Sequence, residues 1–163
     1  MAGLAVLAVA GCGGSYSDGA SAKGSFVSAA DQVCAEHLKT VMDWLVQPRS
    51  GDPWQQQAVE DEGIYEIMSN TIARLESLGR APGPYASAFD AYVGTLKARA
   101  SLYMLTRIAN DRHEGVIALG FQRRIHEIDA LGDRNAHRYG LQICGTGLSD
   151  FGKALSAAGW IAH

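Results

Sequence analysis

Histidines and acidic residues are the side chains of this sequence most able to bind a metal ion. A di-iron or di-manganese bundle would need Glu-x-x-His on two helices, and no histidine here has a glutamate three residues before it. His126 and Asp129 have the spacing of a possible ligand pair, but Arg123 and Asp133 lie near the same helix face. A solvated polar face with local ion pairs explains this group more simply. We therefore expect no metal site and no cofactor.

The other four histidines have structural explanations. His37 lies beside an apolar stripe, which indicates a core or boundary histidine. His113 belongs to a helix start, and His163 is the last residue of the sequence. His137 comes shortly before a cysteine, and we expect it to pack near that residue.

Nucleophilic catalysis needs a serine or cysteine beside a base and an orienting group. The sequence contains no Gly-x-Ser-x-Gly motif, and the Gly145-x-Gly147 pair follows no strand pattern, so it does not indicate a nucleotide-binding loop. The acidic residues Glu60-Asp61-Glu62 and Glu66 predict a solvated helix face, with weak cation binding as the alternative. The protein is therefore predicted not to be an enzyme.

Aromatic side chains are the remaining candidates for ligand binding. Their helical spacing predicts core packing first, and a cavity for a lipid or another apolar ligand second. The set comprises Trp44, Trp54, Tyr65, Tyr85, Phe89, Tyr92 and Tyr103.

Length and composition predict one globular domain. The chain has 163 residues, of which 47% are hydrophobic and 19% charged. Its formal net charge of -3 has the wrong sign for a protein that depends on a phosphate backbone, which argues against nucleic-acid binding. No apolar stretch is long enough for a transmembrane helix.

Four amphipathic segments position these residues. Apolar residues recur three and four positions apart over 28–46, 52–78 and 84–110. Ser28 to Asp31 suggests a capped start for the first segment, while Asp52-Pro53 has the pattern of a helix start for the second.

A fourth helix is expected to start at 111–114. It ends near Leu131 if Gly132 breaks it, or continues to Tyr139, which we favour slightly. Short connections between four such helices predict an all-α fold, an antiparallel four-helix bundle over 26–145. Residues 146–163 form a short closing helix or a tail, because the apolar residues in 148–158 keep helical spacing.

The beginning of the chain has the features of an export signal. Leu4 to Ala10 is apolar but too short to span a bilayer. Val9-Ala10-Gly11-Cys12 resembles the lipobox of bacterial lipoproteins. That resemblance implies that 1–11 is a signal peptide, that Cys12 carries a diacylglycerol, and that the domain is lipid-anchored on the extracytoplasmic face of the cell membrane. The alternative is a short buried element, which Gly13-Gly14-Ser15 would interrupt at once.

The segment after the lipobox is predicted to be flexible. Residues 12–25 comprise the lipidated cysteine and a glycine- and serine-rich stretch with no apolar period. Such a tether would reach roughly 20 Å from the bilayer.

The two other cysteines are Cys34 and Cys144. With Cys12 lipidated, these two remain in a compartment that oxidises thiols, so we expect a Cys34–Cys144 disulfide. Two buried free thiols are the alternative.

The combination of features resembles a loose group of small actinobacterial secreted lipoproteins. These have a lipobox, a tether, a helical domain with an early cysteine, and a Gly-Leu-x-x-Cys near the end, present here from Gly140 to Cys144. The residues predict a non-catalytic binding or interaction module at the cell envelope, with an envelope protein as a possible partner. The alternatives are a carrier of a lipid or other apolar ligand, and an envelope enzyme or metal-binding protein.

Overall fold

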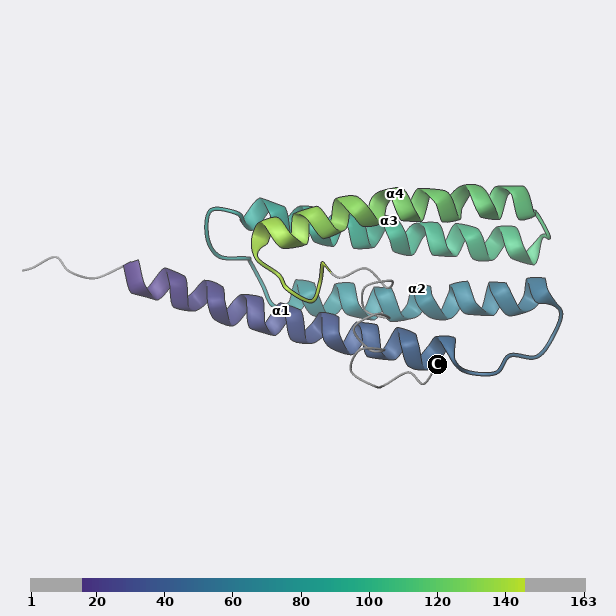
Figure 1. Cartoon of the computed structure of the whole chain (residues 1–163), viewed down its shortest axis with the longest axis horizontal. Helices are drawn as coiled ribbons and strands as arrows, with labels where there is room; N and C mark the ends of the chain where they lie inside the picture. Colours follow the sequence, from purple (N-terminus) through teal and green to yellow (C-terminus); the bar gives the residue numbers. More distant parts are fainter. Residues whose placement is uncertain (1–15, 146–163) are drawn as a thin grey trace, which may run out of the picture.

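The computed structural model describes residues 16–145, which fold into four helices joined by short connections (Figure 1). The elements are α1 (Tyr16–Leu45), α2 (Pro53–Ser77), α3 (Ala86–Asp111) and α4 (Gly115–Tyr139). Within 16–145 there is no strand, and α1 packs on α2, α2 on α3, and α3 on α4. The predicted all-α antiparallel bundle closed by a disulfide is confirmed.

Several predicted features lie outside the described residues. They are the signal peptide 1–11, Cys12 with the start of the tether, and the segment 146–163. Across 16–145, no helix has both the length and the apolar character that a bilayer crossing requires.

The second helix begins where its sequence predicts. The Asp52 carboxylate accepts hydrogen bonds from the backbone N–H groups of Trp54 and Gln55, at 2.9 and 3.1 Å. Pro53 occupies the first helical position, where its missing N–H has no cost. At the other end of the bundle, α4 stops at Gly140, whose φ of 109° is the left-handed conformation that favours glycine.

The first helix corrects two predictions. It begins at Tyr16, so the part of the predicted tether from 16 to 25 is helical, and the cap predicted at Ser28 to Asp31 is wrong. Tertiary contacts explain the difference. The Phe26 ring packs edge-on against the Phe89 ring, 4.9 Å between centroids, and the Lys23 ammonium lies 5.2 Å from the Tyr139 ring centroid. These contacts stabilise a segment whose own composition favours coil.

Two glycines allow close approach between helices. An ideal Cβ at Gly63 would lie 2.1 Å from the Trp44 ring, so the indole lies directly on the α2 backbone. A Cβ at Gly132 would lie 2.9 Å from Thr95 Oγ1 of α3. Packing against α3 therefore explains why α4 continues through Gly132 to Tyr139, the alternative that we favoured slightly from the sequence.

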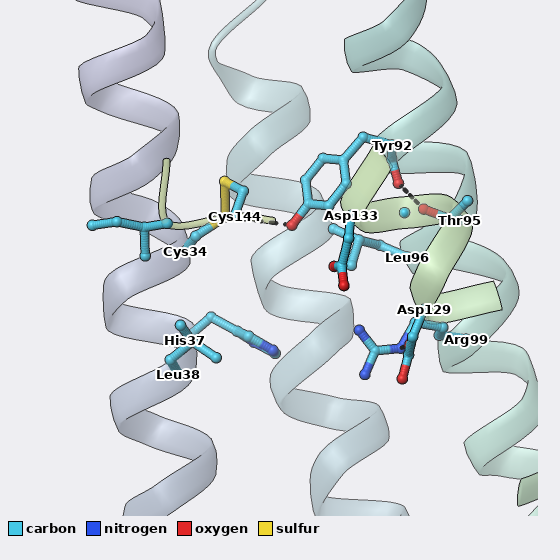
Figure 2. Close-up of a pocket in the computed structure, with 12 residues that line it drawn as sticks. Cys34, His37, Leu38, Tyr92, Thr95, Leu96, Arg99, Asp129, Asp133 and Cys144 are labelled. Atoms are coloured by element: carbon cyan, nitrogen blue, oxygen red, sulfur yellow. Dashed lines mark hydrogen bonds and ion pairs between the residues drawn. A yellow bond between two sulfur atoms is a disulfide. The ribbon is translucent and has the colours of Figure 1, made fainter. Parts of the chain in front are cut away.

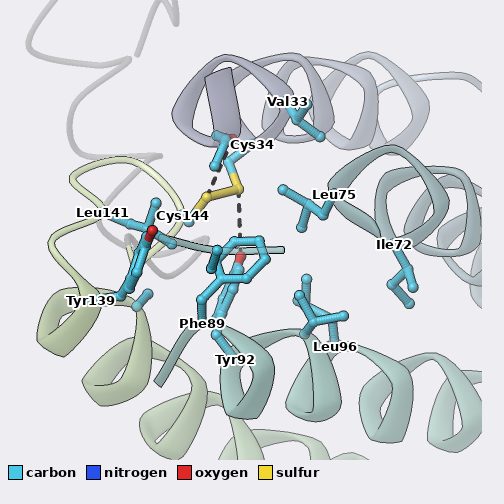
Figure 3. Packing of buried hydrophobic residues seen from close by; sticks show 14 of the residues in the cluster. Val33, Cys34, Ile72, Leu75, Phe89, Tyr92, Leu96, Tyr139, Leu141 and Cys144 are labelled. Atoms are coloured by element: carbon cyan, nitrogen blue, oxygen red, sulfur yellow. Dashed lines mark hydrogen bonds between the residues drawn. A yellow bond between two sulfur atoms is a disulfide. The ribbon is translucent and has the colours of Figure 1, made fainter. Parts of the chain in front are cut away.

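The core lies between the helices and includes the end of the described chain (Figure 3). Its buried members come from all four helices and from the loop after α4. They include Val33, Met68, Ile72, Leu75, Phe89, Tyr92, Leu96, Tyr139 and Leu141.

The loop after α4 is attached to α1 by a covalent bond and by a carboxylate. Cys34 and Cys144 form the predicted disulfide across 110 positions of sequence. One turn earlier on α1, the buried Asp31 side chain accepts hydrogen bonds from the backbone N–H groups of Gln142, Ile143 and Cys144, at 2.9, 2.8 and 3.2 Å. Asp31 thus binds the loop instead of capping a helix.

Asp31→Asn is expected to destabilise the fold by about 1–3 kcal/mol, because an amide presents its NH₂ group to backbone donors and removes the charge from three hydrogen bonds. Asp43→Asn is the matched control, since Asp43 is exposed and pairs with the exposed Lys39; the substitution should change stability by about 0.5 kcal/mol or less. Urea denaturation of the oxidised chain measures both. Equal effects of the two variants would contradict the role of Asp31.

Gly63→Ala is expected to destabilise the protein by about 1–3 kcal/mol, because the added methyl group displaces the Trp44 indole. Gly94→Ala is the matched control in α3, where a Cβ would meet no atom within 4 Å. It should instead stabilise by up to about 1 kcal/mol through helix propensity. Thermal unfolding of the two variants should shift in opposite directions; shifts of the same sign would refute the packing argument.

Candidate functional site

A small cavity beside the disulfide, lined by polar and apolar side chains, is the strongest candidate site in the described part of the chain (Figure 2). It has a volume of about 50 Å³ and lies between α1, α3, α4 and the loop after α4. The residues that line it are Cys34, His37, Leu38, Tyr92, Thr95, Leu96, Arg99, Asp129, Gly132, Asp133, Ile143 and Cys144.

An ion pair forms one wall of this cavity. Arg99 Nε of α3 lies 2.6 Å from Asp129 Oδ1 of α4, and both side chains are mostly buried, with 18% and 29% of their surface exposed. Burial raises the pKa of Asp129, which the nearby Arg99 charge partly offsets. Burial also raises the pKa of Tyr103, which the nearby Arg99 charge partly offsets. Figure 2 shows the two outer guanidinium nitrogens directed toward α1.

His37 faces Arg99 from α1 and is hydrogen-bonded to α2. Its Nδ1 lies 2.9 Å from Thr71 Oγ1, which also lies 2.9 Å from the backbone carbonyl oxygen of Ile67. Burial, and secondly the Arg99 charge, lower the pKa of His37 to about 4, so the ring is neutral at pH 7. The predicted boundary histidine is confirmed.

The disulfide side of the cavity carries hydroxyl groups. The buried Tyr92 hydroxyl lies 3.5 Å from Cys34 Sγ, and burial raises the pKa of this phenol. Thr95 Oγ1 donates to the backbone carbonyl of Tyr92 at 2.6 Å. Hydrogen-bond donors and acceptors from three helices thus converge on one small space.

The other histidines of 16–145 lie outside the lining of this cavity. Asp129 contacts Arg99 instead of acting with His126 as a ligand pair. His113 stacks on Trp54, with ring centroids 5.5 Å apart, and His137 lies beside Gly145, the residue after Cys144. Within 16–145 no three His, Cys, Asp or Glu side chains gather as metal ligands would.

The acidic stretch of α2 contains a buried carboxyl group, where the sequence predicted a solvated face. Asp61 is 2% exposed and accepts a hydrogen bond of 2.8 Å from Asn110 Nδ2 of α3. Burial raises the pKa of Asp61 to about 6. Its position on the same stripe as Ala58, Ile64 and Met68, three or four residues apart, is the signal that indicates burial.

The aromatic residues are divided between the core and the surface. Phe89 and Tyr92 belong to the core as predicted, whereas Trp54 and Tyr85 are 37% and 48% exposed. The others pack partly buried against the core: Trp44, Tyr65 and Tyr103.

A second candidate surface lies where α2 and α4 begin. A groove of about 370 Å³ runs beside Trp54, with Gly115 and Leu119 of α4 among its lining residues. Next to it, Val116 is 85% exposed, an unusual position for an aliphatic side chain. Exposed apolar side chains beside a groove are typical of protein contact surfaces.

No protein-family model matches the chain, and neither the curated proteins nor the solved structures give a significant match. The assignment of a role therefore depends on the residues and geometry described above.

Two buried groups should make opposite contributions to the pH dependence of stability. Burial raises the pKa of Asp61 from 3.8 to about 6, so the contribution of Asp61 to the free energy of unfolding falls as pH rises through that interval. The pKa of His37 is lowered from 6.5 to about 4, so the contribution of His37 to the free energy of unfolding rises as pH rises over nearly the same interval. Each effect is on the order of 2–3 kcal/mol, so the two nearly cancel in the wild type.

Single variants should separate these contributions. Asp61→Asn is expected to make the free energy of unfolding rise between about pH 4 and 6.5, and His37→Gln is expected to make it fall. Chemical denaturation across this range measures both slopes. If both variants keep the wild-type profile, the two groups titrate alike in the folded and unfolded states and the account is wrong.

Proposed function

We propose that this protein is a bacterial lipoprotein, held at the extracytoplasmic face of the cell membrane by a diacylglycerol on Cys12, whose helical domain is a non-catalytic binding module. One observation carries the proposal. The disulfide uses Cys34 and Cys144, and the third cysteine stands in the lipobox-like Val9-Ala10-Gly11-Cys12. A disulfide between elements 110 positions apart fits an oxidising compartment outside the cytoplasm.

The geometry of the candidate site favours binding of a polar molecule over carriage of an acyl chain. The cavity beside the disulfide has a volume of about 50 Å³ and is lined by Arg99, Asp129 and Asp133 among others. An apolar ligand of lipid size needs a larger and less polar space. In the cavity beside the disulfide, the ionic groups also contact one another, since Arg99 pairs with Asp129. This contact fits a rigid recognition site.

The position of the anchor supports a second contact surface for an envelope protein. α1 begins at Tyr16, close to Cys12 in sequence, and its 30 residues extend about 45 Å. The start of α4, whose second residue is Val116, lies at the end of the bundle opposite the start of α1 (Figure 1). The groove beside Trp54 would then be presented away from the anchoring bilayer.

The anchor is tested with the full chain expressed in a bacterium that processes lipoproteins. We expect the wild type to partition into the detergent phase, and mass spectrometry to find a diacylglycerol-modified Cys12 at the mature N-terminus. Cys12→Ser should remain in the aqueous phase, because a serine hydroxyl has no thiolate to accept the lipid.

The cysteine-matched control is Cys34→Ser combined with Cys144→Ser, which should keep its anchor. Recovery of an unmodified N-terminal Met1 from the membrane fraction would overturn the proposal.

A further inference from the structure

We propose that the end of the bundle at which α1 begins docks on a bilayer that contains anionic lipids. The inference rests on the lipid anchor proposed above, which would hold this end close to a membrane, and it adds a second membrane contact. The docking surface, called the basic surface below, consists of exposed or half-exposed side chains of α1, α4 and the loop between α2 and α3. They are Lys23, Arg80, Tyr85, Leu131, Arg134 and Arg138.

The last turns of α4 have one buried and one exposed side. Ala136 and Tyr139 are fully buried, whereas Leu131 is 45% exposed. Arg134 and Arg138 are exposed as well, and their spacing of three and four from Leu131 places all three on one stripe of the helix. A helix face that combines arginines with an exposed leucine is typical of contact with a lipid surface.

Lys23 links this stripe to the loop between α2 and α3, at the end of the bundle where α1 begins (Figure 1). Its ammonium lies 5.2 Å from the Tyr139 ring centroid and 5.6 Å from that of Tyr85. The Tyr139 hydroxyl donates to the Pro82 carbonyl at 3.2 Å, which joins the loop to the end of α4. Arg80 comes two residues before Pro82, so its charge belongs to the same end.

The carboxylates of this half of the bundle are directed elsewhere. Glu76 pairs with Lys97 at 2.6 Å, and Asp90 lines the groove between α2 and α3 with them. Asp133 lines the cavity beside the disulfide. Asp18, in the first turn of α1, offsets part of the positive charge. The basic surface therefore keeps a positive balance and suits an anionic partner.

The proposed anchor would bring the basic surface close to the bilayer. Tyr16 and Lys23 are about 10 Å apart along α1, which is close to the Debye length of about 8 Å at physiological salt. Asp52 and Glu114, just before α2 and α4, lie at the opposite end, about 37 Å away along α2. Because salt screens such distant charges, the net charge of -3 does not prevent the attraction.

Exposed apolar side chains favour a bilayer over a nucleic acid as the partner. A phosphate backbone is bound by cations, whereas the bilayer interface also accepts leucine and tyrosine side chains. On the basic surface, Leu131 and Tyr85 are 45% and 48% exposed. These two side chains would enter the headgroup region while the neighbouring arginines contact lipid phosphates.

The test uses the full chain with Cys12→Ser, which has no thiol to lipidate, so vesicle binding reports the basic surface alone. Flotation at about 0.1 M salt compares vesicles of equal parts phosphatidylglycerol and phosphatidylcholine with vesicles of phosphatidylcholine. We expect at least tenfold stronger binding to the anionic vesicles, because each basic residue near such a surface contributes about fivefold. Salt of about 1 M should release the chain.

Arg138→Glu reverses one charge of the basic surface, so it should weaken binding to anionic vesicles by about 25-fold, or about fivefold for each unit of charge. Arg112→Glu is the matched control, because Arg112 is also exposed at the end of a helix, α3, but at the opposite end of the bundle. It changes the net charge equally and should bind as the parent chain does. Circular dichroism checks that both variants are folded.

Three outcomes would overturn the inference: equal binding to the two kinds of vesicle, equal losses in the two variants, or displacement from the vesicles by a DNA oligonucleotide, which would indicate a general polyanion site. The anchor is tested separately, on the wild-type chain, by the mass of Cys12. Failure of the vesicle test leaves that result unchanged, so failure of the docking surface and failure of the anchoring proposal can be distinguished.

Discussion

The attachment of the loop after α4 to α1 is the constraint on which the rest of this structure depends. A disulfide that closes a loop of about 100 residues is worth on the order of 4.7 kcal/mol in the chain-entropy model. Asp31 adds three charge-assisted hydrogen bonds to the same loop, so its backbone donors are satisfied although no regular element pairs with them. These contacts place Ile143 and Cys144 beside α3 and α4, where both residues form one wall of the polar cavity. Without this attachment the cavity would be an open groove.

Each pair of consecutive helices shares at least one polar contact that is partly or fully buried. His37 meets Thr71 between α1 and α2, Asp61 meets Asn110 between α2 and α3, and Arg99 meets Asp129 between α3 and α4. Apolar stripes alone permit helices to slide by one turn, whereas a buried polar group without its partner costs about 1–3 kcal/mol. We infer that these three contacts fix the register of the helices relative to one another. The polar cavity uses two of them, so the groups that fix the helix register are also those that would recognise a ligand.

Helical periodicity and capping patterns were sufficient to predict four helices, their order and the start of α2 at Asp52-Pro53. The disulfide was predicted from the oxidation of thiols outside the cytoplasm, not from helical periodicity. Three features were beyond local patterns. The helical conformation of 16–25 depends on Phe26 and Lys23 reaching rings of α3 and α4. The hydrogen-bond partner of the buried Asp61 is Asn110, which comes from α3 and is invisible to a local pattern. The pairing of Arg99 with Asp129 joins residues that look like ordinary surface charges in the sequence.

The disulfide links the proposed location of the protein to its proposed binding site. Thiols remain reduced in the cytoplasm, and an exported chain meets oxidising conditions only after translocation. Since Cys144 forms part of the cavity wall, the disulfide covalently fixes that wall to α1. Asp31 alone would hold the loop through hydrogen bonds, each worth far less than the covalent closure. A binding site built in this way becomes complete in the compartment where the lipid on Cys12 would hold the protein, which gives the anchor and the cavity a common requirement for export.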